Sequence, residues 1–271
     1  MSSLENGWVR PASSSEEFME KCNRRNFCLI VYSVTLQTKT SLDEDTVRQT
    51  LKHLYRKVPT LRRCLQKRGE TLWWRDMDQE NIDFKILEES DFNKECFSLG
   101  THCYDSSNGP MWRARLIPIK SGAKLYIPEL EDQFPHHYIL LLGFHHAMTD
   151  GTSTLKIIRF FLQILNSVIK GEYINDQIQL GEHADGSQTI ALKEEKKKEL
   201  NKNPHSKEMK KSKFKYLNRV PFLLQAFPPP IGVTLCTLNM TRDLDELTSS
   251  KFFAKCKAEG VSVHAGFCSI L

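Results

Sequence analysis

Between residues 138 and 169 the chain passes from a continuous apolar run to apolar residues at helical spacing. Ile139–Leu142 is apolar at every position, which predicts a central β-strand covered on both faces. After a polar stretch, a helical period follows at Leu155, Ile158, Leu162, Leu165 and Ile169. We expect Thr152 or Ser153 to be the N-cap of this helix and Lys170-Gly171 to end it. The pattern predicts a strand, a loop and a helix in succession.

Another helix and a hairpin are predicted nearer the N-terminus. Ser41 and Glu44 have the spacing of a capping box, and Pro59 marks where the following helix must have ended. The apolar residues at helical spacing between them are Val47, Leu51 and Leu54. Leu61–Gln66 and Thr71–Trp74 are separated by a polar stretch that contains glycine, which is typical of two strands joined in a hairpin.

A further strand is predicted after the turn Asn108-Gly109-Pro110. Trp112, Ala114 and Leu116 alternate with polar residues there, which indicates a half-buried strand, and Ser121-Gly122 is expected to end it.

The C-terminal third of the chain is less regular. Asp176 to Lys215 is polar and rich in lysine, and order is expected to return near Pro221. Ile231–Met240 is strand-like, and Asp245–Glu259 is helix-like with Gly260 as its C-cap. The apolar segment from 261 to 271 stops without a polar cap, so we expect the chain to be cut short.

These patterns divide the chain into three parts. We predict an N-terminal lobe with the catalytic histidine over residues 1–185, a mobile lysine-rich linker over 186–220, and the start of a truncated C-terminal lobe over 221–271.

Composition and cysteine usage favour a cytoplasmic protein. The hydrophobic fraction of 40% and the charged fraction of 26% suit an ordinary core. The longest apolar run, Tyr138 to Phe144, is too short to cross a bilayer, and the first twenty residues lack a signal peptide's apolar stretch. The eight cysteines contain no CxxC spacing, so we expect reduced, mostly buried thiols.

The net charge of +5 comes from one local run. Residues 193–215 contain ten lysines and four glutamates but one aromatic residue, Phe214. Nucleic-acid binding surfaces combine positive charge with aromatic side chains that stack on bases. We therefore favour a solvated linker and expect no nucleic-acid partner.

The string His145-His146-Ala147-Met148-Thr149-Asp150-Gly151 carries the candidate chemistry. A metal site is disfavoured, because adjacent strand residues point to opposite faces and no third ligand has a matching spacing. A structural role is open for both histidines, and we favour it for His145. For His146 we favour catalysis, since a neutral imidazole accepts a proton from an alcohol or amine near pH 7. Asp150 would then fix the loop or pair with an arginine, and Gly151 would give the backbone freedom for a sharp turn.

The string matches the HHxxxDG signature, and the chain resembles the chloramphenicol acetyltransferase-like superfamily. That superfamily includes alcohol acetyltransferases, plant BAHD acyltransferases and condensation domains of peptide synthetases. Three further segments resemble family motifs in family order: Leu51–Arg63, Gly109–Leu116 and Cys256–Ala265. The alcohol acetyltransferase-like branch fits best.

The resemblance implies a two-lobed α/β fold whose N-terminal lobe is complete and whose C-terminal lobe is only begun. His146 corresponds to the catalytic base, while Asp150, Gly151 and His145 support its loop. Acyl-CoA would be a co-substrate, with acetyl the expected acyl group, and a small alcohol or amine the acceptor. The resemblance implies no metal and no permanently bound cofactor.

The chain departs from the family because most of the second lobe is absent, including a counterpart of the DFGWG motif. No oxyanion donor or CoA contact is therefore assigned, and Lys196–Lys198 fit a solvated surface better than a phosphate site. We expect weak or no activity unless a missing half is supplied. The alternatives are an inactive pseudoenzyme, or a protein of the same fold that binds CoA or another small molecule.

Overall fold

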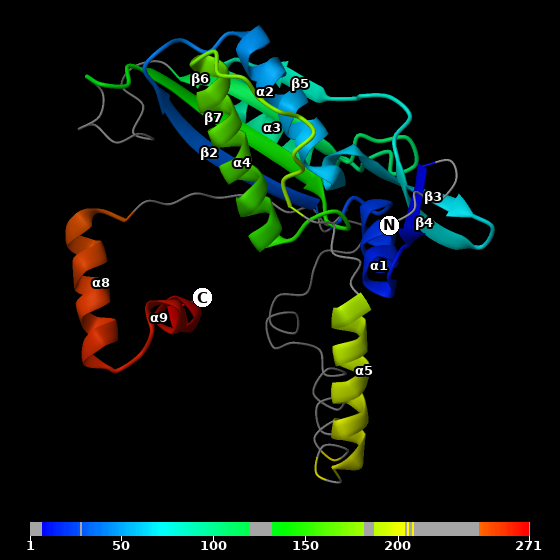
Figure 1. Ribbon diagram of the computed structural model, residues 1–271. Helices are drawn as coiled ribbons and strands as arrows, with labels where there is room; N and C mark the ends of the chain where they lie inside the picture. Colours follow the sequence, from blue (N-terminus) through cyan, green and yellow to red (C-terminus); the bar gives the residue numbers. More distant parts are fainter. Residues whose placement is uncertain are drawn as a thin grey trace, which may run out of the picture. The chain divides into compact units, whose positions relative to one another are not determined.

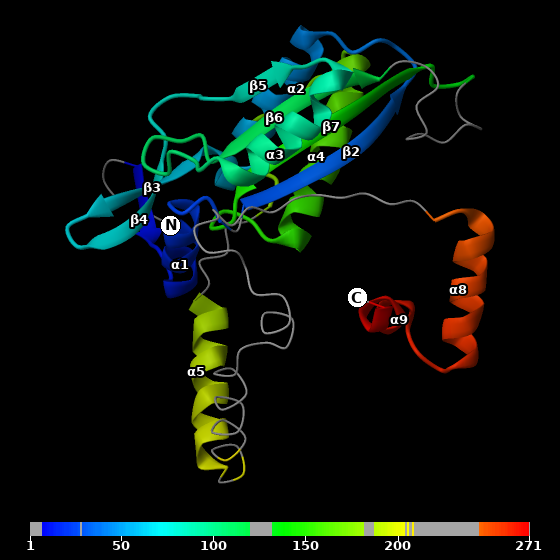
Figure 2. The same ribbon diagram turned by 180° about the vertical axis from the view of Figure 1, so that it is seen from behind.

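The computed structural model describes residues 7–27, 29–119, 132–181, 187–203, 205, 208 and 244–270. Figures 1 and 2 show it from opposite sides. Its contacts divide the chain into two units, Met1–Thr237 and Leu238–Leu271, each of which is described by itself.

The first unit is built on a four-stranded sheet of order β2-β7-β6-β5. β7 (His136–His145) pairs antiparallel with β2 (Leu29–Thr38) and with β6 (Trp112–Ile119), and β5 (Asp83–Ile86) is parallel to β6. β7 is thus an inner strand, and all its residues after His136 are buried. The predicted central strand is confirmed.

Helices cover both faces of this sheet (Figures 1 and 2). α2 (Glu44–Lys57) and α4 (Gly151–Ile169) share one core with alternate β7 residues such as Leu140 and Leu142. α3 (Phe92–Thr101) packs on the opposite face, where Leu99 forms a second cluster with Ile139 and Leu141. The alternation of side chains along a strand explains why the run 139–142 is apolar throughout.

A second sheet, of order β1-β4-β3, includes the predicted hairpin. Its strands are β1 (Trp8–Pro11), β3 (Arg63–Arg68) and β4 (Thr71–Asp76). The 3-10 helix η2 (Pro59–Arg62) joins α2 to β3, and another, η3 (Glu89–Asp91), precedes α3. α1 (Ser14–Asn23) follows β1 and starts with a capping box in which Ser13 and Glu16 satisfy each other's backbone amides.

Three local predictions were wrong. The N-cap of α2 is Asp43, which accepts a hydrogen bond from the Thr46 amide, because Ser41 lies outside the helix beside the Tyr138 hydroxyl. The N-cap of α4 is Asp150, because this helix already begins at Gly151. β6 is mostly buried rather than half-buried, since β7 and β5 flank it and apolar clusters cover both of its faces.

The buried face of α4 also differs from the predicted one. Leu155, Leu162 and Ile169 are exposed by 59%, 40% and 40%, although Ile158 and Leu165 are buried as predicted. The other buried residues are Thr154, Ile157, Phe161 and Ile164. Apolar residues occupy so much of the surface of this helix that the spacing alone admits more than one stripe. Lys170 and Gly171, whose φ is +67°, end α4 as predicted.

The predicted linker contains a helix, α5 (Ser187–Lys202), whose described side chains from 191 onward are exposed. In the second unit, α8 (Glu246–Ala258) has Asp245 as its N-cap, and Gly260 follows it with a φ of +65°. α9 (Val263–Ile270) packs on α8 through Phe267 and Phe252, with ring centroids 4.6 Å apart. The predicted strand Ile231–Met240, Ser121-Gly122 and Pro221 lie outside the described residues.

None of the described helices is both long and apolar enough to cross a membrane. The six described cysteines are unpaired: Cys22, Cys64 and Cys256 are buried, whereas the others are partly or fully exposed.

Candidate active site

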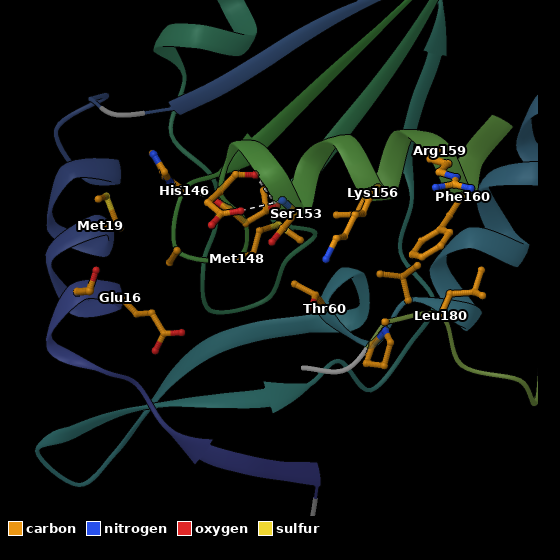
Figure 3. Close-up of a pocket in the computed structure, with 18 of the residues that line it drawn as sticks. Glu16, Met19, Thr60, His146, Met148, Ser153, Lys156, Arg159, Phe160 and Leu180 are labelled. Carbon is orange, nitrogen blue, oxygen red and sulfur yellow. Dashed lines mark hydrogen bonds between the residues drawn. The ribbon is translucent and has the colours of Figure 1, made fainter. Parts of the chain in front are cut away.

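A cavity of about 810 Å³ opens in the first unit beside the N-terminal end of α4 (Figure 3). Figure 3 shows His146 near Met19 and Glu16, while Phe160 and Leu180 lie at the other end and Lys156 extends between them. The lining residues come from β1, α1, the α2–η2 junction, the loop after β7, α4 and the segment before 182; they are Arg10, Ser15, Glu16, Met19, Val58, Pro59, Thr60, His146, Ala147, Met148, Thr149, Asp150, Ser153, Lys156, Ile157, Arg159, Phe160, Gln163, Leu180 and Gly181.

His145, the last residue of β7, is fully buried and uses both ring nitrogens. Nδ1 accepts a hydrogen bond from the Ala147 amide at 2.9 Å, so the ring proton lies on Nε2. Nε2 donates to Glu20 Oε2 at 3.0 Å. His145 does not line the cavity.

His146 begins the loop after β7, is partly exposed and lines the cavity. Its Nδ1 lies 3.1 Å from the Thr149 carbonyl oxygen, which is an acceptor, so Nδ1 carries the proton. Nε2 then holds a lone pair and has no hydrogen-bond partner among the residues that the structure describes. A neutral imidazole with this proton arrangement is ready to accept a proton at Nε2.

Asp150 and Gly151 hold the start of α4. Asp150 accepts a hydrogen bond from the Ser153 amide at 2.7 Å, and that bond lowers the pKa of the carboxyl. Asp150 was predicted either to fix the loop through a hydrogen bond or to pair with an arginine. The structure shows the hydrogen bond, and Asp150 has no arginine partner among the described residues. Gly151 is the first helical residue, and its φ is not positive. The expected need for backbone freedom is wrong; a Cβ here would instead lie 3.4 Å from the Tyr32 hydroxyl.

Two charged residues of the cavity wall form a pair that the motif does not contain. Arg10 donates to both Glu16 carboxylate oxygens, with Nη1–Oε2 at 2.9 Å and Nη2–Oε1 at 2.7 Å. Burial alone would raise the pKa of Glu16. The hydrogen bonds from Arg10 and Ser13 outweigh this effect, so the pKa lies below its usual value. Lys156 and Arg159 make no ion pair with any described residue, so they leave positive charge in the wall.

Arg10, Glu16 and Glu20 were not predicted from the sequence. The only local signal was the spacing Ser13-x-x-Glu16, which marks a capping box and hence a helix at this place. Nothing in the sequence indicates that this helix lies beside a loop more than a hundred residues away.

Across the part of the chain that the structure describes, no three His, Cys, Asp or Glu side chains gather as metal ligands would. His146 and Asp150 each have another partner, Thr149 and Ser153 respectively.

A family model for the condensation domain matches residues 27–202. The chain belongs to the condensation-domain family. The expected membership of the chloramphenicol acetyltransferase-like group and the mixed α/β fold are thereby confirmed. The matched region contains the whole segment His145–Gly151, whereas β1 and α1, with Arg10, Glu16 and Glu20, precede it.

Solved structures with TM-scores above 0.5 share this fold. The X-domain from teicoplanin biosynthesis has a TM-score of 0.51 and 14% identity, over 75% of this chain and 41% of that one. The complex of the X-domain and OxyB from the same biosynthesis has a TM-score of 0.51 and 13% identity, over 65% and 35%. A variant of the starter condensation domain of rhizomide synthetase RzmA in complex with C8-CoA has a TM-score of 0.48 and 12% identity, over 62% and 37%.

This condensation-family chain thus spans about two fifths of the length of these three solved structures. No curated protein sequence matches it.

Proposed function

We propose that the chain supplies the general base, His146, of an acyltransferase that moves an acyl group from acyl-CoA to a small alcohol or amine. One observation carries the proposal: the Nδ1–H···O=C bond to Thr149 leaves Nε2 of a cavity-lining imidazole as a proton acceptor. Membership of the condensation-domain family supports acyl transfer as the reaction class. No retained cofactor takes part, because acyl-CoA is a co-substrate.

In the proposed reaction, the acceptor hydroxyl or amine gives its proton to His146 Nε2 as its oxygen or nitrogen attacks the thioester carbonyl carbon. The tetrahedral intermediate then expels the CoA thiolate as the C–S bond breaks. The thiolate takes the proton from Nε2, which restores the neutral imidazole. The proposal assigns no donor for the oxyanion.

The composition of the cavity wall supports this substrate class. Apolar side chains such as Met19, Ile157 and Phe160 suit an apolar acceptor body or acyl chain, with acetyl as the expected group. The unpaired positive charge of Lys156 and Arg159 suits the phosphates of CoA.

The test is release of free thiol when the full chain is mixed with acetyl-CoA and a panel of alcohols and amines. We expect slow turnover that His146→Ala lowers about 100-fold or more. The matched control is His102→Ala, which removes an exposed imidazole outside the cavity wall and should leave the rate unchanged. Acceptor-dependent turnover that survives His146→Ala would refute the assigned base.

A second candidate is a non-catalytic protein that binds CoA or another small molecule in the same cavity. The unpaired positive charge of Lys156 and Arg159 in the cavity wall suits CoA binding whether or not acyl transfer follows. Calorimetric titration with CoA and acetyl-CoA separates the two: binding without thiol release at any acceptor concentration supports the second candidate.

A further inference from the structure

Glu20 of α1 is a buried carboxylate that faces the end of β7. Oε2 accepts hydrogen bonds from His145 Nε2 at 3.0 Å and from Ser106 Oγ at 2.5 Å, and Oε1 accepts one from Arg24 Nε at 2.8 Å. The side chains of Glu20 and His145 are only 8% and 0% exposed. Such a charged buried group is tolerated because its oxygens are fully supplied with donors.

A continuous set of contacts leads from this carboxylate to His146. His145 presents Nδ1 to the Ala147 amide at 2.9 Å, and its carbonyl oxygen accepts from the Met148 amide at 3.1 Å. The same short loop ends at Thr149, whose carbonyl oxygen holds the Nδ1 proton of His146 at 3.1 Å. Thr149 Oγ1 lies 3.0 Å from Thr154 Oγ1, which ties the loop to α4.

We propose that Glu20 is a positioning residue for His146: it fixes the proton of His145 on Nε2, and His145 then fixes the loop that orients His146. This positioning role rests on the proposed function in one respect, because that function is what gives His146 a chemical task. It adds to that function a residue of α1 that precedes the region matched by the family model.

The chemical reason is that a carboxylate can only accept. It therefore selects the one tautomer of His145 in which Nδ1 is free to accept from Ala147. A glutamine at position 20 offers an NH₂ group as well. The opposite tautomer then becomes possible, and Nδ1–H would face the Ala147 N–H, so the loop would have to move.

The charged and titratable groups around this pair come from three places. Arg24 on α1 contacts Glu20 directly. The Tyr104 ring has its centroid 6.2 Å from that of His145, and Arg113 of β6 lies over that tyrosine ring. Asp105 is near enough to interact electrostatically with Glu20. Of these titratable groups, His145 is the one whose ring nitrogen is hydrogen-bonded to Glu20.

The experiment is side-chain ¹⁵N NMR of the full chain near pH 7, which reports the tautomer of each histidine. In the wild type we expect His145 with its proton on Nε2 and His146 with its proton on Nδ1. In Glu20→Gln we expect a several-fold rise in the Nε2–H form of His146, together with shifts of the Ala147 and Thr149 amides. The matched control is Glu17→Gln, which removes one charge from the same helix and has no hydrogen bond to the loop.

Unchanged His146 tautomers in a folded Glu20→Gln protein would overturn the proposal. If Glu20→Gln does not fold, two other measurements decide. The wild-type spectrum overturns the proposal if His145 carries its proton on Nδ1. Glu20→Asp keeps an acceptor-only group at a longer distance, and we expect it to retain the tautomers of both His145 and His146. A change of the His146 tautomer while that of His145 is retained would also overturn the proposal.

These outcomes are distinct from failure of the proposed function. If no acceptor is ever acylated while the tautomers change as expected, the acyltransferase proposal falls and the positioning role stands. If His146→Ala abolishes turnover while Glu20→Gln leaves the tautomers and kcat unchanged, the positioning role falls alone.

Discussion

Gly143 of β7 lies so close to Tyr104 that a Cβ built on the glycine would be 2.6 Å from the tyrosine hydroxyl oxygen. The same Cβ would be 3.1 Å from Leu99 Cδ2. The site loop begins at His146, three residues later in the chain and just after β7 ends, so the packing of Gly143 bears on the stability of the site.

We predict that Gly143→Ala lowers the free energy of unfolding by roughly 1–3 kcal/mol, because both neighbours are buried and must shift. Urea denaturation measures the loss. Gly100→Ala is the control, since a Cβ there would meet only Val31 Cγ2, at 3.8 Å, and should not destabilise. Adding Tyr104→Phe should restore part of the loss, because it removes the oxygen that the new Cβ would meet. It breaks no hydrogen bond among the described residues. Equal stability of Gly143→Ala and the wild type would contradict the packing.

Asp150→Ala should destabilise the start of α4 by about 1 kcal/mol, because the Ser153 amide loses its side-chain acceptor. Asp150→Asn keeps an acceptor oxygen and should lose much less. Thermal unfolding followed by circular dichroism compares the two. An equal loss in Asp150→Asn and Asp150→Ala would show that the charge, rather than the acceptor oxygen of the cap, is what matters.

Acid stability should depend on Glu20. Burial raises the pKa of Glu20, but hydrogen bonds from His145, Ser106 and Arg24 outweigh it and hold the pKa at about 2. The folded pKa is below that of an unfolded glutamate, near 4.3, so the stabilisation is complete above about pH 5 and is lost as the pH falls toward 2. We expect this loss to be roughly 2–3 kcal/mol in the wild type.

The measurement is the urea midpoint at successive pH values from 6 downward. Glu20→Gln should be less stable at pH 6 and should lose less stability on acidification, because position 20 no longer takes up a proton. Parallel pH curves for the two proteins would exclude a depressed pKa at Glu20.

The segment from 173 to 181 forms one end of the cavity and is tied to α2. Asp176 accepts from Arg56 Nη1 at 3.2 Å and lies 2.7 Å from His53 Nδ1, while the Leu180 amide donates to the Lys57 carbonyl oxygen at 2.6 Å. Leu180 and Gly181 line the cavity.

Asp176→Ala should therefore speed hydrogen exchange at the Leu180 amide by several-fold, because two side-chain anchors of the segment are lost. Exchange mass spectrometry measures this effect. Asp91→Ala, at the end of η3 and outside the cavity wall, is the control and should leave this exchange unchanged. If the two variants exchange alike, the anchors do not hold the segment.

Much of the frame around the site was predictable because its signals are local. The apolar run of β7 and the Lys170-Gly171 end of α4 each depend on a few consecutive residues. The buried stripe of α4 was less predictable, since Leu155 and Leu162 are as apolar as the residues that are buried. Which apolar residues of α4 are buried depends on how the helix packs against the sheet.

Within the site, the sequence located His146 and the loop but not their supports. The contact of Glu20 with His145 joins residues 125 positions apart, and no spacing rule connects them. The role of Gly151 was misjudged for a related reason: its nearest obstacle is Tyr32, on a neighbouring strand rather than in the turn.

α1 contributes to the site twice, through the cavity wall at Glu16 and Met19 and through the support of His145 at Glu20. A shorter isoform that lacked this helix would still carry the complete histidine motif and would be detected by any scan for it. Its imidazole at 146 would nonetheless stand in an unfinished and unsupported site. In this chain the motif is therefore a weaker guide to an intact site than the motif together with α1.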